Sequence, residues 1–354
     1  MAIEPKERQR RKTTQGATIR DVAAKAGVSP MTVSRVINGE ENVKPETRDL
    51  VNGVIRELSY APNAAARSLA GSAPSRIGLL YDNPSTGFLS EVLIGVLDES
   101  SRTGAQVVLE RCLDGESAIT ALNKLLSNGV DGLILPPPLC ESADILAAVR
   151  ASQTVAVAVA PGLASSEMAS LRIDNRMAAF ELTQHLIDLG HRRFGFIKGH
   201  PNQSVSEQRL EGFLAALKTA EIDPATASIE QGYFSYRSGL DAAERLLCCD
   251  PRPTAIFAAN DDMAAATLTV IHRYGLSAPE DISVVGFDDT PIASTVWPAL
   301  TTVRQPIASM ARMAVDLVLE EIRRRRGAGG EPRQGMHPHM LVIRDSTGPV
   351  PGGG

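Results

Sequence analysis

The spacing of apolar residues between positions 18 and 58 predicts three short helices. Thr18 is placed to cap the first helix, with Asp21 three residues later. Ser29 caps the second, because Pro30 follows it at the first helical position, where a missing amide proton costs nothing. The third helix begins at Pro45. Its apolar positions are one, three and four residues apart, and they are Leu50, Val51, Val54, Ile55 and Leu58.

The second helix has an apolar side and a polar side. Val33, Val36 and Ile37 fall on the apolar side. The residues expected to point outward near its N-terminus are Met31, Thr32, Ser34 and Arg35. In helix-turn-helix modules this part of the second helix meets base edges, while caps and helix N-termini meet phosphate. The segment therefore predicts a DNA-binding head, although a glycine turn between two short helices is also a common helical hairpin.

From residue 75 onward, continuous apolar runs alternate with helical stretches. A first series of runs covers 76–83, 105–112, 129–138 and 155–161, and a second covers 192–199, 228–233, 254–260 and 282–289. Strands that are apolar on both faces, with helices between them, are typical of parallel sheets covered on both sides. Two series predict two lobes.

Ligands in open parallel sheets bind beyond the carboxyl ends of the strands. The polar residues at those ends are Tyr81-Asp82-Asn83, Lys198-Gly199, Asn260-Asp261 and Asp288-Asp289. Such groups can hydrogen-bond a small polyhydroxylated molecule, with Phe88 or Phe234 as a flat apolar wall. A sugar is the first expectation. The alternative for each Asp or Asn alone is a helix N-cap just after its strand.

The charge is unevenly distributed along the chain. Residues 1–71 hold 12 Lys/Arg and 8 Asp/Glu, net +4, whereas the rest holds 24 and 33, net −9. Residues 1–17 form a basic arm that is expected to be disordered, and it either adds phosphate attraction or is only a solvated tail. No apolar run is long enough for a membrane span, and no signal peptide is recognised, so we expect a cytoplasmic protein.

Catalytic and metal signatures are absent from the sequence. The four cysteines lack metal-ligand spacing, and the adjacent pair Cys248-Cys249 suits buried thiols better than a disulfide. No P-loop, dinucleotide-binding glycine fingerprint or nucleophile elbow is present. We therefore expect no metal, no cofactor and no enzymatic activity.

Several motifs resemble the lac repressor family of bacterial transcription regulators. They are VSPMTVSRVIN, YAPNAAARSLAG, LIDLGHRRFGFIKG, RLEGF, FAANDDMA and SVVGFDDTP. The resemblance implies an all-α helix-turn-helix head and a hinge helix, joined to a two-lobed α/β core like that of periplasmic binding proteins, with parallel sheets. It also implies three crossings between the lobes, near 173–175, 302–305 and 337–341.

The expected domain boundaries follow from these motifs. The head covers 18–62, the hinge helix and linker 63–74, and the effector-binding and dimerisation core 75–346. Within the core, the N-lobe covers about 75–173 and 305–336, and the C-lobe about 174–304 and 337–346. Residues 347–354 are expected to form a disordered tail without heptads, so they supply no tetramerising bundle.

The resemblance also implies which residues contact DNA. They are Thr18, Ile19, Ser29, Pro30, Met31, Thr32, Ser34, Arg35, Asn38, Asn63, Ala66, Arg67 and Leu69. In the family the segment matching 63–70 is a helix that folds on the operator, and its Leu, here Leu69, wedges into a minor-groove step. The extra contacts that a kink allows repay the few kcal/mol of unstacking. A leucine that only packs a linker helix is the alternative.

For the effector site the resemblance implies Arg209 and Asp288 as contacts, supported by Asn260, Phe234 and Phe88. Arg209 can grip a hydroxyl pair, carboxylate or phosphate with two parallel hydrogen bonds. The chain departs from several relatives at 159–161, where they carry an acidic residue, and at Gln203 and Val205. The ligands of those relatives therefore do not identify the ligand of this chain.

The expected function is a dimeric bacterial repressor that binds palindromic double-stranded operator DNA. A small-molecule effector, a sugar or sugar derivative, regulates it allosterically, and its targets are carbohydrate-utilisation genes. When bound to its operator the protein is nucleoid-associated. The alternatives are a solute-binding protein for sugar transport and a regulator co-repressed by a non-sugar metabolite.

Overall fold

The computed structural model describes residues 18–37, 43–58, 74–112, 117–165, 167–325 and 332–350. The chain divides into two compact units after Pro74. The first is a small helical head, and the second is a two-lobed α/β core. This confirms the predicted fold class apart from the hinge helix, which lies outside the described residues.

Three helices form the head: α1 (Ile19–Ala26), α2 (Pro30–Ile37) and α3 (Pro45–Glu57). Both expected caps are present. The Thr18 amide donates to Asp21 Oδ2 at 2.8 Å, and Thr18 Oγ1 accepts from the Asp21 amide. Ser29 Oγ accepts from the Thr32 amide at 3.1 Å. Gly27 ends α1 in the left-handed conformation that glycine adopts without strain.

Small aliphatic side chains fill the core of the head. The buried members are Val22, Ala23, Ala26, Val33, Val36, Val43, Val51 and Val54. The apolar spacing of the third helix favours Leu50 as a core residue together with Val51 and Val54, but this expectation is wrong, because the Leu50 side chain is 52% exposed. Val51 and Val54 take the inward positions of α3, and Leu50, one residue before Val51, lies about 100° around the helix from it.

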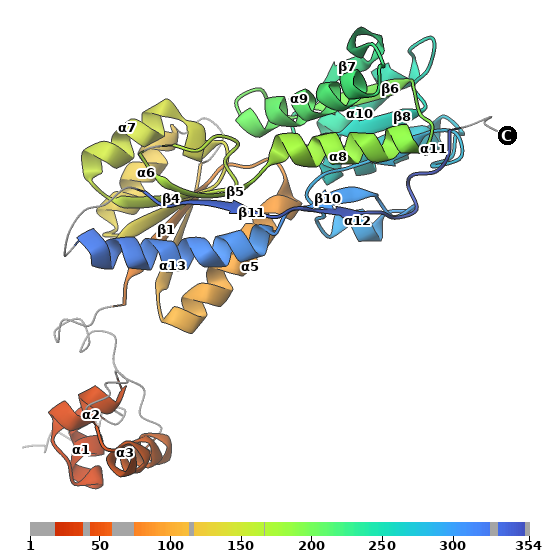
Figure 1. The fold of residues 1–354 in the computed structure, drawn as a ribbon. Coiled ribbons are helices and arrows are strands. Elements are labelled where there is room, and N and C mark those ends of the chain that lie inside the picture. The colour runs from red at the N-terminus through yellow and green to blue at the C-terminus, as the bar shows by residue number, and fades with distance from the viewer. Residues whose placement is uncertain are drawn as a thin grey trace, which may run out of the picture. The chain divides into compact units, whose positions relative to one another are not determined.

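Six parallel strands form the sheet of the first lobe, in the order β11-β5-β4-β3-β1-β2. Helices α5 and α13 lie side by side on one face, and α6 and α7 lie on the other (Figure 1). The bounds are β1 Arg76–Tyr81, α5 Thr86–Thr103, β2 Gln106–Arg111, α6 Ala118–Ser127, β3 Gly132–Leu135, η1 Leu139–Glu141, α7 Ala143–Ser152, β4 Val155–Val159, β5 Ala169–Ile173, α13 Ile307–Arg325 and β11 Gln334–His337.

Four parallel strands form the sheet of the second lobe, in the order β7-β6-β8-β9. Helices α8 and α9 pack together, as do α10 and α11 (Figure 1). The bounds are α8 Asn175–Asp188, β6 Phe194–Lys198, α9 Ser204–Thr219, η2 Pro224–Thr226, β7 Ser228–Gln231, α10 Tyr236–Leu247, β8 Ala255–Ala258, α11 Asp261–Arg273, β9 Ser283–Val285 and α12 Ile292–Thr295.

Three chain segments join the two lobes. They run from β5 to α8, from β10 (Thr302–Arg304) to α13, and from β11 to β12 (Met340–Val342). Strands β10 and β12 form a separate antiparallel pair, which the sequence pattern did not predict. The carboxyl ends of both main sheets therefore face the boundary between the lobes.

The chain end differs from expectation over residues 347–350. The Gly348 carbonyl lies 3.1 Å from the buried His191 ring, and the Gly348 amide donates to Ser283 Oγ. The Val350 amide donates to the Leu189 carbonyl at 3.1 Å. This part of the tail is ordered against the second lobe because its backbone groups find partners there. The expectation of buried thiols at the adjacent cysteines is also wrong at Cys248, which is exposed.

Candidate functional site

The outward side of the head lies at the N-terminal end of α2. Met31 is 65% exposed, and Arg35 is exposed one turn further along the helix. Ser29 and Pro30 are exposed as well, and Thr32 and Ser34 are half-buried. The helix N-terminus adds backbone N–H groups that attract phosphate. These predicted DNA contacts therefore share one accessible surface.

The remaining predicted DNA contacts fall into two groups. The Thr18 hydroxyl bonds to Asp21 within the capping box, and the side chain of Ile19 packs partly against the core of the head. The others lie outside the described residues, and they are Asn38, Asn63, Ala66, Arg67 and Leu69. The hinge-helix interpretation stays a prediction.

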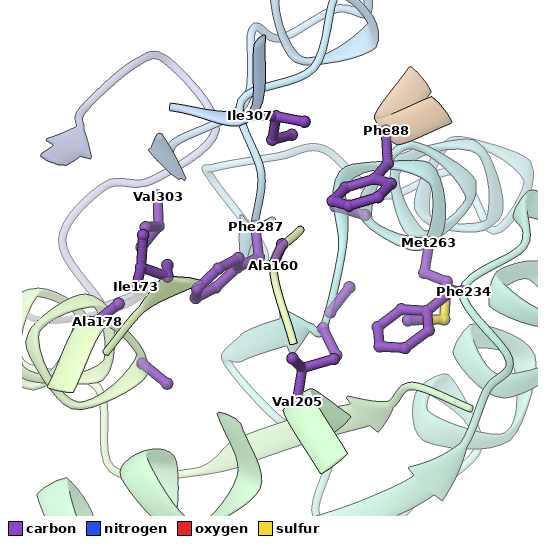
Figure 2. Packing of buried hydrophobic residues seen from close by; sticks show 14 of the residues in the cluster. Phe88, Ala160, Ile173, Ala178, Val205, Phe234, Met263, Phe287, Val303 and Ile307 are labelled. Atoms are coloured by element: carbon purple, nitrogen blue, oxygen red, sulfur yellow. The ribbon is translucent and has the colours of Figure 1, made fainter. Parts of the chain in front are cut away.

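A small cavity lies between the two lobes of the core. Its volume is about 20 Å³, room for about one water molecule. All five predicted effector residues line it. The lining is Asn83, Ser85, Phe88, Pro137, Ala160, Gln203, Val205, Arg209, Phe234, Asn260, Asp288 and Gln305. Figure 2 shows that the apolar members Phe88, Ala160, Val205 and Phe234 face a common space.

Arg209 and Asp288 form the charged centre of this cavity. Arg209 Nη2 lies 3.3 Å from Asp288 Oδ1, and both side chains are almost fully buried. The guanidinium also donates to Asn175 Oδ1 at 3.0 Å and to the Ala259 carbonyl at 2.6 Å. Its carbon lies 3.7 Å from the centroid of the Phe287 ring. Arg209 is therefore held in place on several sides and is not a solvated arginine on the helix surface.

Burial controls the ionisation of this centre. It raises the pKa of Asp288 to about 6, although Arg209 acts in the opposite direction. It raises the pKa of Asp261 well above its usual range, and the nearby charge of Asp288 adds to that shift. The pKa of Arg209 is lowered by burial, against the pull of Asp288. Perturbed groups of this kind gather at functional sites.

Backbone strain is concentrated at the same place. Six described residues other than glycine have a positive φ, and three of them line the cavity: Ala160 at 54°, Phe234 at 59° and Asp288 at 108°. Such conformations cost about 1–3 kcal/mol each and persist where the surroundings enforce them, often at ligand sites.

Asn260 caps a helix and also bonds to the loop of Phe234. Its Oδ1 accepts from the Met263 amide at 3.0 Å, which caps α11. Its Nδ2 donates to the Phe234 carbonyl at 3.0 Å and so fixes the strained loop that carries Phe234 into the cavity. The capping interpretation holds for Asn260, and a ligand contact stays a prediction.

The residues after β9 have separate surroundings. Asp288 faces the cavity, whereas Asp289 accepts from Arg304 and Arg344 at 2.6 Å each and does not line it. The sequence pattern predicts that Asp288 and Asp289 both lie at the ligand site, but only Asp288 lines the cavity.

Sequence reasoning missed Gln305, Ser85 and Pro137. Gln305 Nε2 donates to Asp288 Oδ1 at 2.6 Å, while its Oε1 is buried and has no partner among the described residues. A buried acceptor without a donor is unfavourable, so this oxygen is ready for a ligand hydroxyl or amine. The sequence did contain a signal for Gln305, because this residue ends the predicted crossing between the lobes at 302–305.

Within the described part of the chain, no group of three or more His, Cys, Asp or Glu side chains is arranged to hold a metal ion. Over those same residues, no helix is long and apolar enough to cross a membrane.

Two family models match the chain. A model of bacterial regulatory proteins of the lacI family matches residues 18–63, and one of a periplasmic binding protein-like domain matches residues 183–347. A helix-turn-helix head on a two-lobed ligand-binding core defines the class of ligand-responsive DNA-binding regulators.

Similar proteins match nearly the whole chain. Catabolite control protein A of Priestia megaterium is 32% identical over 93% of this chain and 99% of its own length. The ribose operon repressor of Escherichia coli K12 is 36% identical over 86% and 93%. A solved structure of the lac repressor dimer bound to operator and the anti-inducer ONPF has a TM-score of 0.74 and 31% identity, with 94% and 100% covered. The chain belongs to the lacI family, and it is a regulator rather than an enzyme.

Proposed function

We propose that this protein is a dimeric transcriptional repressor whose affinity for a palindromic operator is set by a small molecule bound between the lobes. A sugar or sugar derivative is the favoured effector, and the regulated genes are those of carbohydrate utilisation. The cavity supports this chemistry, because it combines a guanidinium, a carboxylate and amide groups with two phenylalanine rings.

The observation that carries the proposal is the closed interlobe cavity around Arg209 and Asp288. About 20 Å³ is far below the roughly 300–1,000 Å³ of ordinary small-molecule sites. An effector can enter only if the lining side chains, or the lobes that carry them, rearrange. A ligand that binds one arrangement better shifts the population toward it, and a coupling of about 1–3 kcal/mol changes operator affinity about 5- to 150-fold.

The head supplies the other half of the mechanism. The exposure of Met31 and Arg35 on α2 supports a role in contacting base edges, and one head of this kind covers only a half-site. Two heads related by a twofold axis read a palindrome, as the dimer of the lac repressor on its operator suggests. Such a regulator acts on chromosomal DNA in the cytoplasm and is nucleoid-associated while bound to its operator. A solute-binding protein for transport does not require a DNA-binding head, so the head argues against that alternative.

Selection of DNA from a random pool by the purified full-length protein tests the proposal. We expect enrichment of one palindromic sequence and binding at least about 1,000-fold tighter than to scrambled DNA at the same salt concentration. Recovery of unrelated sequences with equal affinities would contradict it. The enriched operator then allows sugars, sugar phosphates and purines to be screened for their effect on binding, which separates the favoured effector from a non-sugar co-repressor.

A further inference from the structure

A carboxylate of the first lobe caps a helix of the second. Glu141, the last residue of η1, accepts from the Ser204 amide at 2.8 Å through Oε2 and from Ser204 Oγ at 2.6 Å through Oε1. Ser204 is the first residue of α9, and the side chain of its own N-cap residue, Gln203, makes no capping bond. The helix therefore receives a negative charge at its positive end from the opposite lobe.

The contact is close as well as charged. Glu141 Oε1 also accepts from the Gly162 amide at 2.8 Å, and Gln208 Nε2 donates to the Gly162 carbonyl at 2.8 Å. A Cβ at Gly162 would clash with Ser204 Oγ and would lie 2.7 Å from the Val205 amide nitrogen. The loop after β4 thus fits against the first turn of α9 only because residue 162 has no side chain.

The first turns of α9 also build the effector cavity. Gln203 and Val205, on either side of Ser204, line it, and Arg209 follows on the same helix. A second bond between the lobes, from Ser85 Oγ to Asp262 Oδ2 at 2.6 Å, is made by a residue that lines the cavity from the first lobe. Opening the cavity to admit an effector therefore changes how the lobes meet at both contacts.

We propose that Glu141 is a positioning residue that holds the lobes in their closed arrangement by capping α9 from the opposite lobe. Glu141 does not line the effector cavity. It acts on the cavity through Ser204 and the residues on either side of Ser204. The inference goes beyond the proposed function, because it concerns the closed state of the chain whatever the effector is.

Hydrogen–deuterium exchange of the full-length protein, with no DNA or small molecule added, tests it. Glu141→Gln keeps the size of the side chain but removes its charge. We expect exchange to become at least about tenfold faster at amides 162 and 204–206, since bonds to a charged group are lost. We also expect faster exchange on the cavity walls, at amides 85–88 and 260–263, because the lobes separate.

Two further variants control the result. Glu167→Gln also removes a carboxylate from the first lobe, but one that pairs on the surface with Arg150, and it should leave both sets of amides unchanged. Gly162→Ala disturbs the same contact by bulk and should reproduce the exchange pattern of Glu141→Gln. It does so without altering any charge, so it also serves if Glu141→Gln does not fold.

The outcomes separate two roles for Glu141. Faster exchange on the cavity walls in both variants supports the proposal. Faster exchange confined to the first turn of α9 would show a local cap only and would overturn it, as would unchanged exchange in Glu141→Gln. Because the experiment uses neither operator nor effector, its outcome is independent of whether the proposed function is correct.

Discussion

Asp288→Asn is the substitution that examines the effector cavity most specifically. The replacement has nearly the same shape, so the loop after β9 keeps its packing. The charge that faces Arg209 Nη2 at 3.3 Å is lost, and the acceptor that receives Gln305 Nε2 at 2.6 Å becomes neutral. Arg209→Ala is a poorer probe, since it removes a whole side chain that also bonds to Asn175 and to the Ala259 carbonyl, and losing one partner of a buried ion pair in this way typically costs about 3–5 kcal/mol of stability.

The expected magnitude follows from these contacts. A hydrogen bond to a charged group contributes about 1.5–3 kcal/mol, so an effector that bonds to this carboxylate should bind about 10- to 150-fold more weakly. Calorimetry with the small molecule that alters operator binding measures the loss. Operator affinity without effector should stay close to that of the natural protein, because Asp288 lies in the core unit and not in the head.

Asp289→Asn is the matched control. Its carboxylate is equally buried and bonds to Arg304 and Arg344, but it does not line the cavity. We expect a lower Tm with effector affinity within about twofold of the natural protein, because the Asp289 carboxylate bonds to Arg304 and Arg344 and not to the cavity. Unchanged effector affinity in a folded Asp288→Asn protein would refute the role assigned to Asp288.

Four further outcomes are expected. Burial raises the pKa of Asp288 from its unfolded value of 3.8 to about 6, so the contribution of Asp288 to stability is full below the unfolded pKa and is lost as the pH rises through about 6. Between pH 4 and pH 7 the Tm should therefore fall less in Asp288→Asn than in the natural protein. A constant difference between the two Tm curves would count against this. Met31→Ala or Arg35→Ala should lower operator binding by about 1–3 kcal/mol in gel-shift titrations, with little change on scrambled DNA if the lost contact is to a base edge. Leu69→Ala should preserve the dimer and the effector response but weaken operator binding and reduce DNA bending in circular-permutation assays; an unchanged bend would exclude the wedge. Arg209→Ala should lower the free energy of unfolding by about 3–5 kcal/mol in denaturant titrations, whereas a change below about 1 kcal/mol would mean that the buried pair is not required by the fold.

Local chemistry made part of the fold predictable. The cap at Thr18 and the left-handed Gly27 act within a few residues, so the sequence pattern contains all that is needed to place them. The strands of the two sheets were predictable for a different reason, since burial on both faces leaves continuous apolar runs. Because these strands could be recognised, their carboxyl ends could be located as well, and ligands bind beyond the carboxyl ends of parallel strands. This placed Asn260 and Asp288 at the cavity.

Contacts between distant segments were not predictable from such patterns. Glu141 and Ser204 are 63 residues apart, and nothing near either residue in the sequence indicates the other. The bonds of Gly348 to His191 and Ser283 depend likewise on where the second lobe leaves room. Leu50 shows that a local pattern can also mislead. Helical spacing alone does not decide which apolar residue at the margin of a helix face is buried.

Reciprocal linkage between operator and effector tests the central claim most directly. Operator affinity is measured by fluorescence anisotropy with and without saturating effector, and effector affinity by calorimetry with and without saturating operator. If one equilibrium between lobe arrangements connects the two sites, both ratios must be equal, and we expect a value of about 5 to 150. An effector affinity that operator DNA leaves unchanged would contradict the account.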